Sequence, residues 1–294
     1  MFTISNLEQH PGSIFFVHSG TGTNGAGYGQ NPDAPVATLD YAVGLCTASK
    51  GDVIYVLPGH AENVASATAC VLDIAGVKVI GLGNGALRPT LSLTAATGAT
   101  ISVTAANCSL ENLLIVGNFL NVAAAITLAA TATGTTLRNI ETRDTSVVLG
   151  ALIQISIAAL CSDVTIDGYK HLTVAGGLTA AATNVILCAG AADRLVLKNS
   201  RIYGHTSAAP VALSAAASVD VLIENVYLKN TDTSAGLGIA AHNSTTGYIQ
   251  NVSVTNLKNN IVGVTGTGLA VGDSVKYSNA LGAYAGIVCY TIDS

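Results

Sequence analysis

Residues 247–254 read Gly-Tyr-Ile-Gln-Asn-Val-Ser-Val, and they contain the phrase that decides the fold: an apolar residue, any residue, then asparagine. The phrase occurs five times, and a related phrase that ends in glycine fills the one gap. The six copies begin at Leu110, Leu137, Ile166, Leu197, Ile223 and Ile249. The steps between them are 27, 29, 31, 26 and 26 residues. A period of this size is typical of a solenoid, in which successive turns of the chain stack on one another.

The residues around each copy indicate two short strands that meet at a bend. In the last copy Ile249, Val252 and Val254 share one face, while Gln250 and Ser253 lie on the other. This alternation of apolar and polar residues is typical of a half-buried strand, and the asparagine interrupts it. A second set of apolar strands precedes the copies with nearly the same spacing, at 101–103, 126–128, 153–155, 185–187, 211–213 and 237–239. The sequence therefore predicts two sets of strands, each stacked from turn to turn along the solenoid.

The asparagine position has a physical reason of its own. Asparagine and glycine tolerate the left-handed backbone that a bend often requires, and a side-chain amide can donate to and accept from the amide of the next turn. We expect Gly168 to satisfy the backbone but to interrupt the stack of amides. The predicted ladder consists of Asn112, Asn139, Gly168, Asn199, Asn225 and Asn251.

The residue just before each ladder position alternates in charge. Stacked like charges would repel, whereas alternating charges attract by about 0.2–1 kcal/mol per exposed pair. We interpret this charge ladder as a device that fixes the register of the turns, with no catalytic role. It consists of Glu111, Arg138, Asp167, Lys198 and Glu224, and Gln250 ends it.

Composition excludes several classes of function. Only 10% of the 294 residues are charged, and a net charge of −5 with 12 Lys+Arg leaves no basic footprint for nucleic acid. No apolar run is long enough to span a membrane, and residues 1–10 do not read as a signal peptide. The six cysteines are scattered without metal-ligand spacing, so we expect apolar fillers and neither a metal nor a cofactor.

The N-terminal block carries a resemblance to a known superfamily. It reads Phe16-Val-His-Ser-Gly20, then a glycine-rich stretch, then Gly51-Asp-Val-Ile-Tyr-Val-Leu-Pro-Gly59. This block resembles the opening of pectate-lyase-like right-handed parallel β-helix proteins, in which a strand, a glycine-rich loop, a capping helix and a GD-x-I-x-V-x-PG strand begin the coil. The helix also follows from the residues, because Thr38 is a suitable N-cap and apolar residues follow it at helical spacing. These helix residues are Leu39, Ala42, Val43 and Cys46.

The expected fold is therefore all-β, a right-handed parallel β-helix of about eight coils with a short N-terminal capping helix near 38–47. We expect an N-terminal arm at 1–13, one β-helix domain at 14–271 and a C-terminal tail at 272–294. The resemblance does not decide activity, because one scaffold can carry many functions.

A search for catalytic residues gives weak candidates. Pectate lyases are similar to one another in a calcium-binding acidic cluster, but here the acids of the charge ladder are separated by cations. Polygalacturonase-like hydrolases carry an Asn-Thr-Asp motif and later a Gly-His-Gly motif. This chain has Asn230-Thr231-Asp232, but Gly204-His205-Thr206 comes before it and the paired aspartate is missing.

Other polar residues were weighed for chemistry and for structure. A glycosidase needs two carboxyl groups about 5–9.5 Å apart, and the nearest candidates pair Asp144 with Asp163 or Asp193 with Asp220, which we interpret as turn caps. We interpret His171 and His205 as packed or rim histidines, because no acidic partner is spaced to orient them. Arg201 and Tyr227 are expected to face outward on neighbouring turns, where they could bind a sugar or a partner.

These observations favour a non-enzymatic virion structural protein. The specific expectation is a capsid decoration or cement protein on the capsid surface, which assembles as a homotrimer and binds the major capsid protein or another virion protein. The main alternative is a tailspike-like or lyase-like β-helix that binds or cleaves polysaccharide. A third possibility is a self-assembling surface-layer or adhesin subunit.

Overall fold

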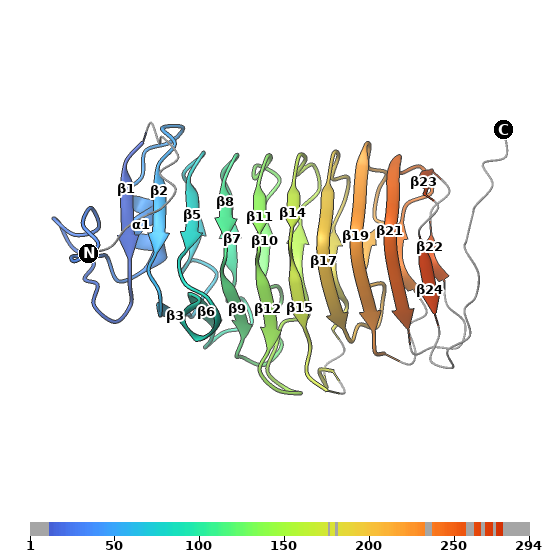
Figure 1. The fold of residues 1–294 in the computed structure, drawn as a ribbon, viewed down its shortest axis with the longest axis horizontal. Coiled ribbons are helices and arrows are strands. Elements are labelled where there is room, and N and C mark those ends of the chain that lie inside the picture. Colours follow the sequence, from blue (N-terminus) through green and yellow to red (C-terminus); the bar gives the residue numbers. More distant parts are fainter. Residues whose placement is uncertain are drawn as a thin grey trace.

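The repeated phrase forms the bend of a large sheet that runs along the whole molecule (Figure 1). The computed structural model describes residues 12–175, 177–179, 182–232, 237–256, 262–265, 268–272 and 275–278. The chain is an all-β parallel solenoid, and the strand pairs that build its two sheets are parallel. Each strand lies beside the equivalent strand of the turn before it.

The larger sheet, which we call the corner sheet, has 16 strands arranged in two arms that meet at the asparagine ladder. The first arm precedes the ladder and contains β1 (Ile14–Val17), β2 (Val53–Val56), β5 (Lys78–Gly81), β8 (Ser109–Glu111), β11 (Thr136–Arg138) and β14 (Thr165–Asp167). The second arm follows it and contains β3 (Ala61–Val64), β6 (Thr90–Leu93), β9 (Leu114–Gly117), β12 (Glu141–Asp144) and β15 (Lys170–Leu172). Three strands continue through both arms, namely β17 (Val196–Gly204), β19 (Val221–Asn230) and β21 (Gly247–Asn256). The last two strands pair with β21 and are β23 (Leu269–Val271) and β24 (Lys276–Ser278).

The second sheet has eight strands and contains the predicted second register. Its members are β4 (Val71–Leu72), β7 (Ile101–Val103), β10 (Ile126–Leu128), β13 (Ile153–Ile157), β16 (Asn184–Cys188), β18 (Val211–Leu213), β20 (Leu237–Ala241) and β22 (Val262–Thr265). These strands delimit about seven turns, close to the eight coils expected.

A single apolar core fills the space between the sheets. The leading residues of the six copies stack in register and are each at most 1% exposed. Burying a leucine or isoleucine side chain of this kind contributes about 1.5–3 kcal/mol. Cys70, Cys161 and Cys188 also lie in this core as free thiols, and burial raises the pKa of Cys161 to about 11. Cys289 lies outside the described residues.

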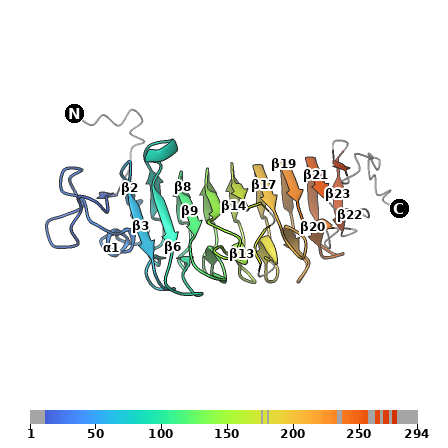
Figure 2. The same ribbon diagram turned by 90° about the horizontal axis from the view of Figure 1, so that it is seen from below.

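Helix α1 (Leu39–Gly44) lies at the N-terminal end of the solenoid (Figures 1 and 2). The hydroxyl of Thr38 accepts a hydrogen bond from the backbone N–H of Tyr41, so the predicted N-cap is confirmed. Leu39 is fully buried and its N–H donates to the carboxylate of Glu62 at 2.9 Å. His60 Nε2 lies 3.0 Å from the same carboxylate, which ties the helix to β3. A short 3-10 helix, η1 (Gly85–Leu87), precedes β6.

The predicted arm at 1–13 and tail at 272–294 lie mostly outside the described residues. Within the segment predicted as tail, β24 pairs with β21 and so belongs to the solenoid. Among the described residues, no helix is long and apolar enough to cross a membrane.

Candidate functional site

The asparagine ladder lies at the bend of the corner sheet. Its side chains bond from turn to turn: Nδ2 of Asn139 donates to Oδ1 of Asn112 at 2.9 Å, Asn225 donates to Asn199 at 3.2 Å, and Asn251 donates to Asn225 at 2.5 Å. All members have left-handed backbone, with φ of 56° at Asn112, 49° at Asn139, 70° at Gly168, 52° at Asn199, 54° at Asn225 and 49° at Asn251. The ladder asparagines therefore adopt the left-handed backbone and form the turn-to-turn amide hydrogen bonds that the sequence predicts.

The interruption expected at Gly168 is bridged by its neighbour. Nδ2 of Asn199 donates to Oδ1 of Asp167 at 2.8 Å, so a carboxylate from the charge ladder replaces the missing amide. Asp167 thus serves both ladders, since Lys198 Nζ lies 3.7 Å from its other oxygen.

The charge ladder stacks in the expected register. Oε1 of Glu111 forms ion pairs with Nη1 of Arg138 at 3.6 Å and with Nζ of Lys78, from the preceding turn, at 3.3 Å. At the other end, Nε2 of Gln250 donates to Glu224 at 2.7 Å. Exposed pairs of this kind contribute about 0–1 kcal/mol each, so they favour a register more than they stabilise the fold.

A second left-handed ladder lies at the corner that precedes the first arm, and the sequence analysis missed it. It runs through Asn107, Gly134, Asp163, Arg194 and Asp220, with φ between 56° and 73°. Its signal in the sequence was an Asn, Gly or Asp three residues before most copies of the phrase.

This second ladder explains three of the candidate aspartates. Asp163 accepts two hydrogen bonds from Arg194, at 2.6 and 2.8 Å, and these lower its pKa. Asp193 accepts from the backbone N–H of Val219 at 2.9 Å, and Asp220 itself has φ of 57°. Each aspartate of the candidate pair Asp193 and Asp220 thus has a conformational or capping role.

Asp144 ends β12 at the opposite edge of the corner sheet from Asp163. It is 9% exposed and accepts hydrogen bonds from Ala151 N at 3.2 Å and Gln154 Nε2 at 3.4 Å. Burial raises the pKa of Asp144 to about 6, against these hydrogen bonds and one from Thr173. Its nearest carboxylate along the strand, Glu141, faces outward while Asp144 faces inward, so the two do not share a substrate face.

We expect Asp144→Asn to stabilise the protein at pH 8. Because the folded pKa lies above the unfolded value of 3.8, stability is lost as pH rises from about 4 through 6. At pH 8 that loss is on the order of 2–3 kcal/mol, and an asparagine avoids it while its carbonyl still accepts from Ala151. Urea unfolding at pH 8 and pH 4 measures the effect, which should shrink at pH 4.

Asp163→Asn is the matched control for this variant. Because the pKa of Asp163 is lowered, the wild type should gain stability relative to that variant as pH rises. If both variants respond to pH in the same direction, burial of Asp144 is not the cause.

His171 is a packed histidine, as the sequence suggested. It is 2% exposed, and its Nδ1 lies 2.9 Å from Oγ1 of Thr142, which also lies 2.7 Å from the hydroxyl of Tyr169. Burial lowers the pKa of His171 to about 3. Burial therefore keeps the imidazole neutral at physiological pH, against the opposite effect of a hydrogen bond with Thr142.

His205 does have an acidic partner, contrary to our expectation. Its Nε2 lies 3.6 Å from Oδ2 of Asp232, and its Nδ1 lies 3.1 Å from Oγ1 of Thr231. The two motifs are about one turn apart in sequence, so stacking brings them together. Asn230 fixes the arrangement because its amide donates to Thr206 O and accepts from Thr206 N, both at 3.1 Å.

The outward face of the second arm gathers cations and tyrosines. Arg201 lies over the rings of Tyr203 and Tyr227, 4.9 and 5.8 Å from their centroids, and the two rings are 5.6 Å apart. We call this face the cationic stripe, and its members are Arg143, Lys170, Arg201, Tyr203, Tyr227 and Lys229. In the described part of the second arm, Glu141 is the one carboxylate on this face, although the whole chain carries a net charge of −5.

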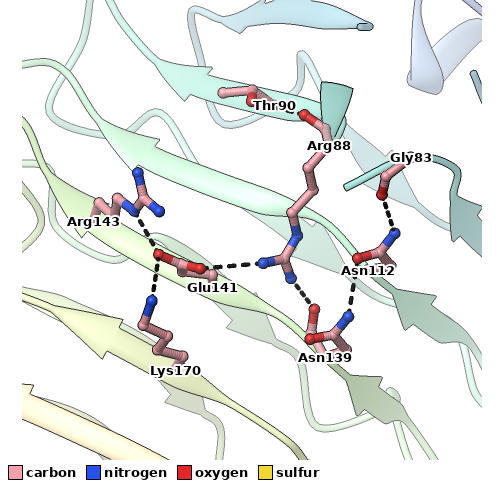
Figure 3. Close-up of polar contacts among 8 residues, drawn as sticks. All are labelled: Gly83, Arg88, Thr90, Asn112, Asn139, Glu141, Arg143 and Lys170. Atoms are coloured by element: carbon pink, nitrogen blue, oxygen red, sulfur yellow. Dashed lines mark hydrogen bonds and ion pairs between the residues drawn. The ribbon is translucent and has the colours of Figure 1, made fainter. Parts of the chain in front are cut away.

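Glu141 is the centre of a buried ionic cluster at one end of the stripe (Figure 3). Its carboxylate binds Arg88 Nη1 at 3.2 Å, Lys170 Nζ at 3.3 Å and Nε of Arg143. Although burial raises its pKa, the hydrogen bonds and charges of Arg143 and Lys170 outweigh burial and leave the pKa of Glu141 lowered. One carboxylate therefore holds three cations in place.

A recess of about 320 Å³ opens beside this cluster. It is lined by Gly85, Ala86, Arg88, Thr90, Leu114, Glu141 and Arg143. The loop that delivers Arg88 is held by the first ladder asparagine, since Nδ2 of Asn112 donates to the carbonyls of Gly81 at 2.8 Å and Gly83 at 3.0 Å. Arg88 also donates to the backbone carbonyl of Asn139 (Figure 3).

No metal cluster accompanies these sites. Across the described residues, no group of three or more His, Cys, Asp or Glu side chains gathers where it could hold an ion.

The fold and this face define a parallel β-solenoid with a cationic stripe on one arm of its corner sheet. No protein-family model matches the chain, and no curated protein matches its sequence. A solved structure of the GH136 lacto-N-biosidase from Eubacterium ramulus is similar, with 10% sequence identity and a TM-score of 0.39 over 91% of this chain and 67% of that chain. This distant likeness concerns the solenoid fold alone.

Proposed function

We propose that this chain is a non-enzymatic structural protein of a virion, specifically a decoration or cement protein that assembles as a homotrimer on the capsid surface. Its partners are copies of itself and the major capsid protein or another virion protein. The proposal extends the resemblance of residues 16–62 to pectate-lyase-like β-helix proteins, a scaffold that also serves as phage structural protein.

One observation carries the non-enzymatic part: the candidate carboxylates are engaged within the fold. Glu141 is bound by three cations, Asp163 by Arg194, Asp167 by Asn199 and Lys198, and Asp193 by the backbone of the next turn. A glycosidase pair needs one carboxyl to protonate the leaving group and a second to act across the same sugar ring. The engaged carboxylates favour a structural role.

The surface suits lateral assembly. Leu120, Val147 and Val148 are 45–51% exposed on the loops after β9 and β12, and Leu120 pairs with Leu149 across these loops. Exposed apolar side chains that gather on one surface often mark contacts between proteins. The low content of charged residues lets such surfaces approach without strong repulsion.

The native mass of the purified protein tests the assembly. We expect a trimer by analytical ultracentrifugation, and dissociation of that trimer when Val147 and Val148 are both replaced by aspartate. The matched control is Leu160→Asp. Leu160 is 71% exposed and lies away from these loops in the sequence, in the turn before β14, so this variant should leave the trimer intact. A monomer at micromolar concentration would overturn the trimer, and mass spectrometry of the source virion without this chain would overturn the capsid role.

A second candidate function is polysaccharide binding or cleavage, as in tailspike-like or lyase-like β-helix proteins. The Arg201–Tyr203–Tyr227 platform favours it, because tyrosine rings offer apolar faces on which a sugar ring can stack while a guanidinium contacts its polar groups. Glycan-array binding that is lost in Tyr227→Ala and retained in Tyr248→Ala would support it. Release of reducing or unsaturated ends would replace the non-enzymatic proposal.

A further inference from the structure

We propose that the recess beside Glu141 binds a doubly charged tetrahedral oxyanion, a sulfate or phosphate group, through Arg88 and Arg143, which line it, with the charge of Lys170 close by on the other side of Glu141. This site is independent of the proposed assembly, because its residues lie on the second arm and on the loop before β6, and not on the apolar loops after β9 and β12. The proposal follows from the charge, the free donors and the shape of the recess.

The charge of the cluster does not balance internally. Three cations surround the single carboxylate of Glu141, which leaves a formal surplus of two positive charges. Arg88 and Glu141 are 14% and 7% exposed, so water screens this part of the cluster poorly. A dianion would neutralise the surplus, whereas a monoanion would leave half of it.

The cations retain donors that Glu141 does not use. Nε of Arg88 is fully buried, and among the buried side-chain nitrogen and oxygen atoms of the described residues it alone has no hydrogen-bond partner. Arg143 uses only its Nε for Glu141, and Lys170 uses one of its three N–H donors. Guanidinium groups in a fixed position match the oxygens of sulfate and phosphate, often with two donors each.

The site is organised before any ligand arrives. Glu141 orients three cations from three segments of the chain: the loop before β6, β12 itself and β15. The asparagine ladder holds that loop through Gly81 and Gly83, and Arg88 is fixed to Asn139 (Figure 3). Groups held in this way lose little freedom on binding, which favours affinity.

The recess has room for the proposed group. A water molecule takes up about 30 Å³ of the liquid, so about 320 Å³ accommodates a tetrahedral oxyanion together with part of the molecule that carries it. Thr90 lines the same space, and its hydroxyl donates to the backbone carbonyl of Arg88 at 3.2 Å, which helps to hold Arg88 in place. The same chemistry serves a free sulfate or phosphate ion, a phosphorylated sugar and a phosphorylated side chain.

Isothermal titration calorimetry with sodium sulfate and with sodium phosphate tests the proposal, in chloride buffer at constant ionic strength. We expect both anions to bind with one site per chain, and acetate and nitrate to bind at least about tenfold more weakly. Arg143→Gln should weaken sulfate binding by about tenfold or more, as the loss of a charge-assisted hydrogen bond implies. Lys170→Gln should also weaken it, because it removes one of the two surplus positive charges beside the recess. Both side chains are about half exposed, so these variants should fold.

Lys198→Gln is the matched control, because it removes one exposed cation from a strand of the same sheet that pairs with Asp167 instead. Sulfate binding that survives Arg143→Gln and Lys170→Gln, or that falls equally in Lys198→Gln, would overturn the site. Acetate binding as tight as sulfate binding would overturn the preference for a dianion.

Three further titrants identify the source of the group: a monosaccharide phosphate and a phosphoserine peptide, which carry the dianion, and a monosaccharide sulfate, whose ester has one charge and is the monoanionic comparison. An ester that binds more tightly than the free ion indicates that the group arrives on that carrier. Equal or weaker binding of all three esters indicates a site for the free ion.

Discussion

Replacing Asn225 with valine should lower the free energy of unfolding by about 2–5 kcal/mol. A β-branched residue at a φ of 54° costs about 1–3 kcal/mol in backbone strain. The variant also loses the amide bonds to Asn199 and Asn251, which contribute about 0.5–1 kcal/mol each at this exposed edge. Urea unfolding followed by circular dichroism at pH 7 measures the sum.

Asn225→Gly separates the two contributions. Glycine adopts the left-handed backbone without strain, so only the amide bonds and some chain entropy are lost, and we expect a cost of about 1–2 kcal/mol. If glycine costs as much as valine, the stack of amides and not the bend is the dominant requirement. If valine costs nothing, the ladder does not determine the turn.

The second large effect is acid destabilisation by His171. Its folded pKa is about 3 because the ring is buried, whereas an unfolded histidine titrates near 6.5. The unfolded chain therefore binds a proton first, so stability is full above pH 6.5 and is lost as pH falls from 6.5 towards 3. At pH 4 the loss is on the order of 3 kcal/mol.

His171→Gln should abolish this part of the pH dependence. Asp144 titrates in the same range with the opposite sign, so the comparison is made in an Asp144→Asn background. Free energies of unfolding at pH 7, 5.5 and 4 give the slope. Thr142→Val is the control: it removes the hydrogen bond to the ring but keeps the buried imidazole, and it should retain the acid sensitivity. Equal slopes in the two variants would contradict the assignment to His171.

The solenoid and the register of its strands were predictable, because the stacking of turns restricts which residue types can occupy each position of the repeat. A residue such as Leu137 must be apolar because it is buried between the same positions of two neighbouring turns. Asn139 must tolerate a left-handed bend and bond to its neighbour. Requirements that repeat in each turn leave a period in the sequence, and that period can be read without a structure.

The ionic recess was not predictable from the same period. Arg88 and Glu141 are separated by 53 residues, about two turns, and the reach of Arg88 depends on the path of the loop from Leu82 to Arg88. A loop that differs from its neighbours leaves no repeat to detect. Part of the site did carry a signal, since Glu141 and Lys170 occupy equivalent outward positions just after the ladder.

The pairing of His205 with Asp232 shows a different kind of error. The two motifs lie one turn apart, so stacking places His205 beside Asp232 whatever the order of the motifs along the chain. In a solenoid, separation by one period predicts contact more reliably than order along the chain.

The parallel pairing of each turn with the one before it also bears on how the chain is made. A strand such as β10 pairs with β7 and β13, which lie one turn away on either side, so it depends on residues that are synthesised at most about one turn later. Helix α1 and the first strands are synthesised before the others, and each later turn can pair with the strands of the turn before it. Contacts confined to neighbouring turns allow the structure to start at one place and to propagate from turn to turn. We therefore expect growth of the native structure to be directional, with the nascent solenoid lengthening one turn at a time while the ribosome is still translating it.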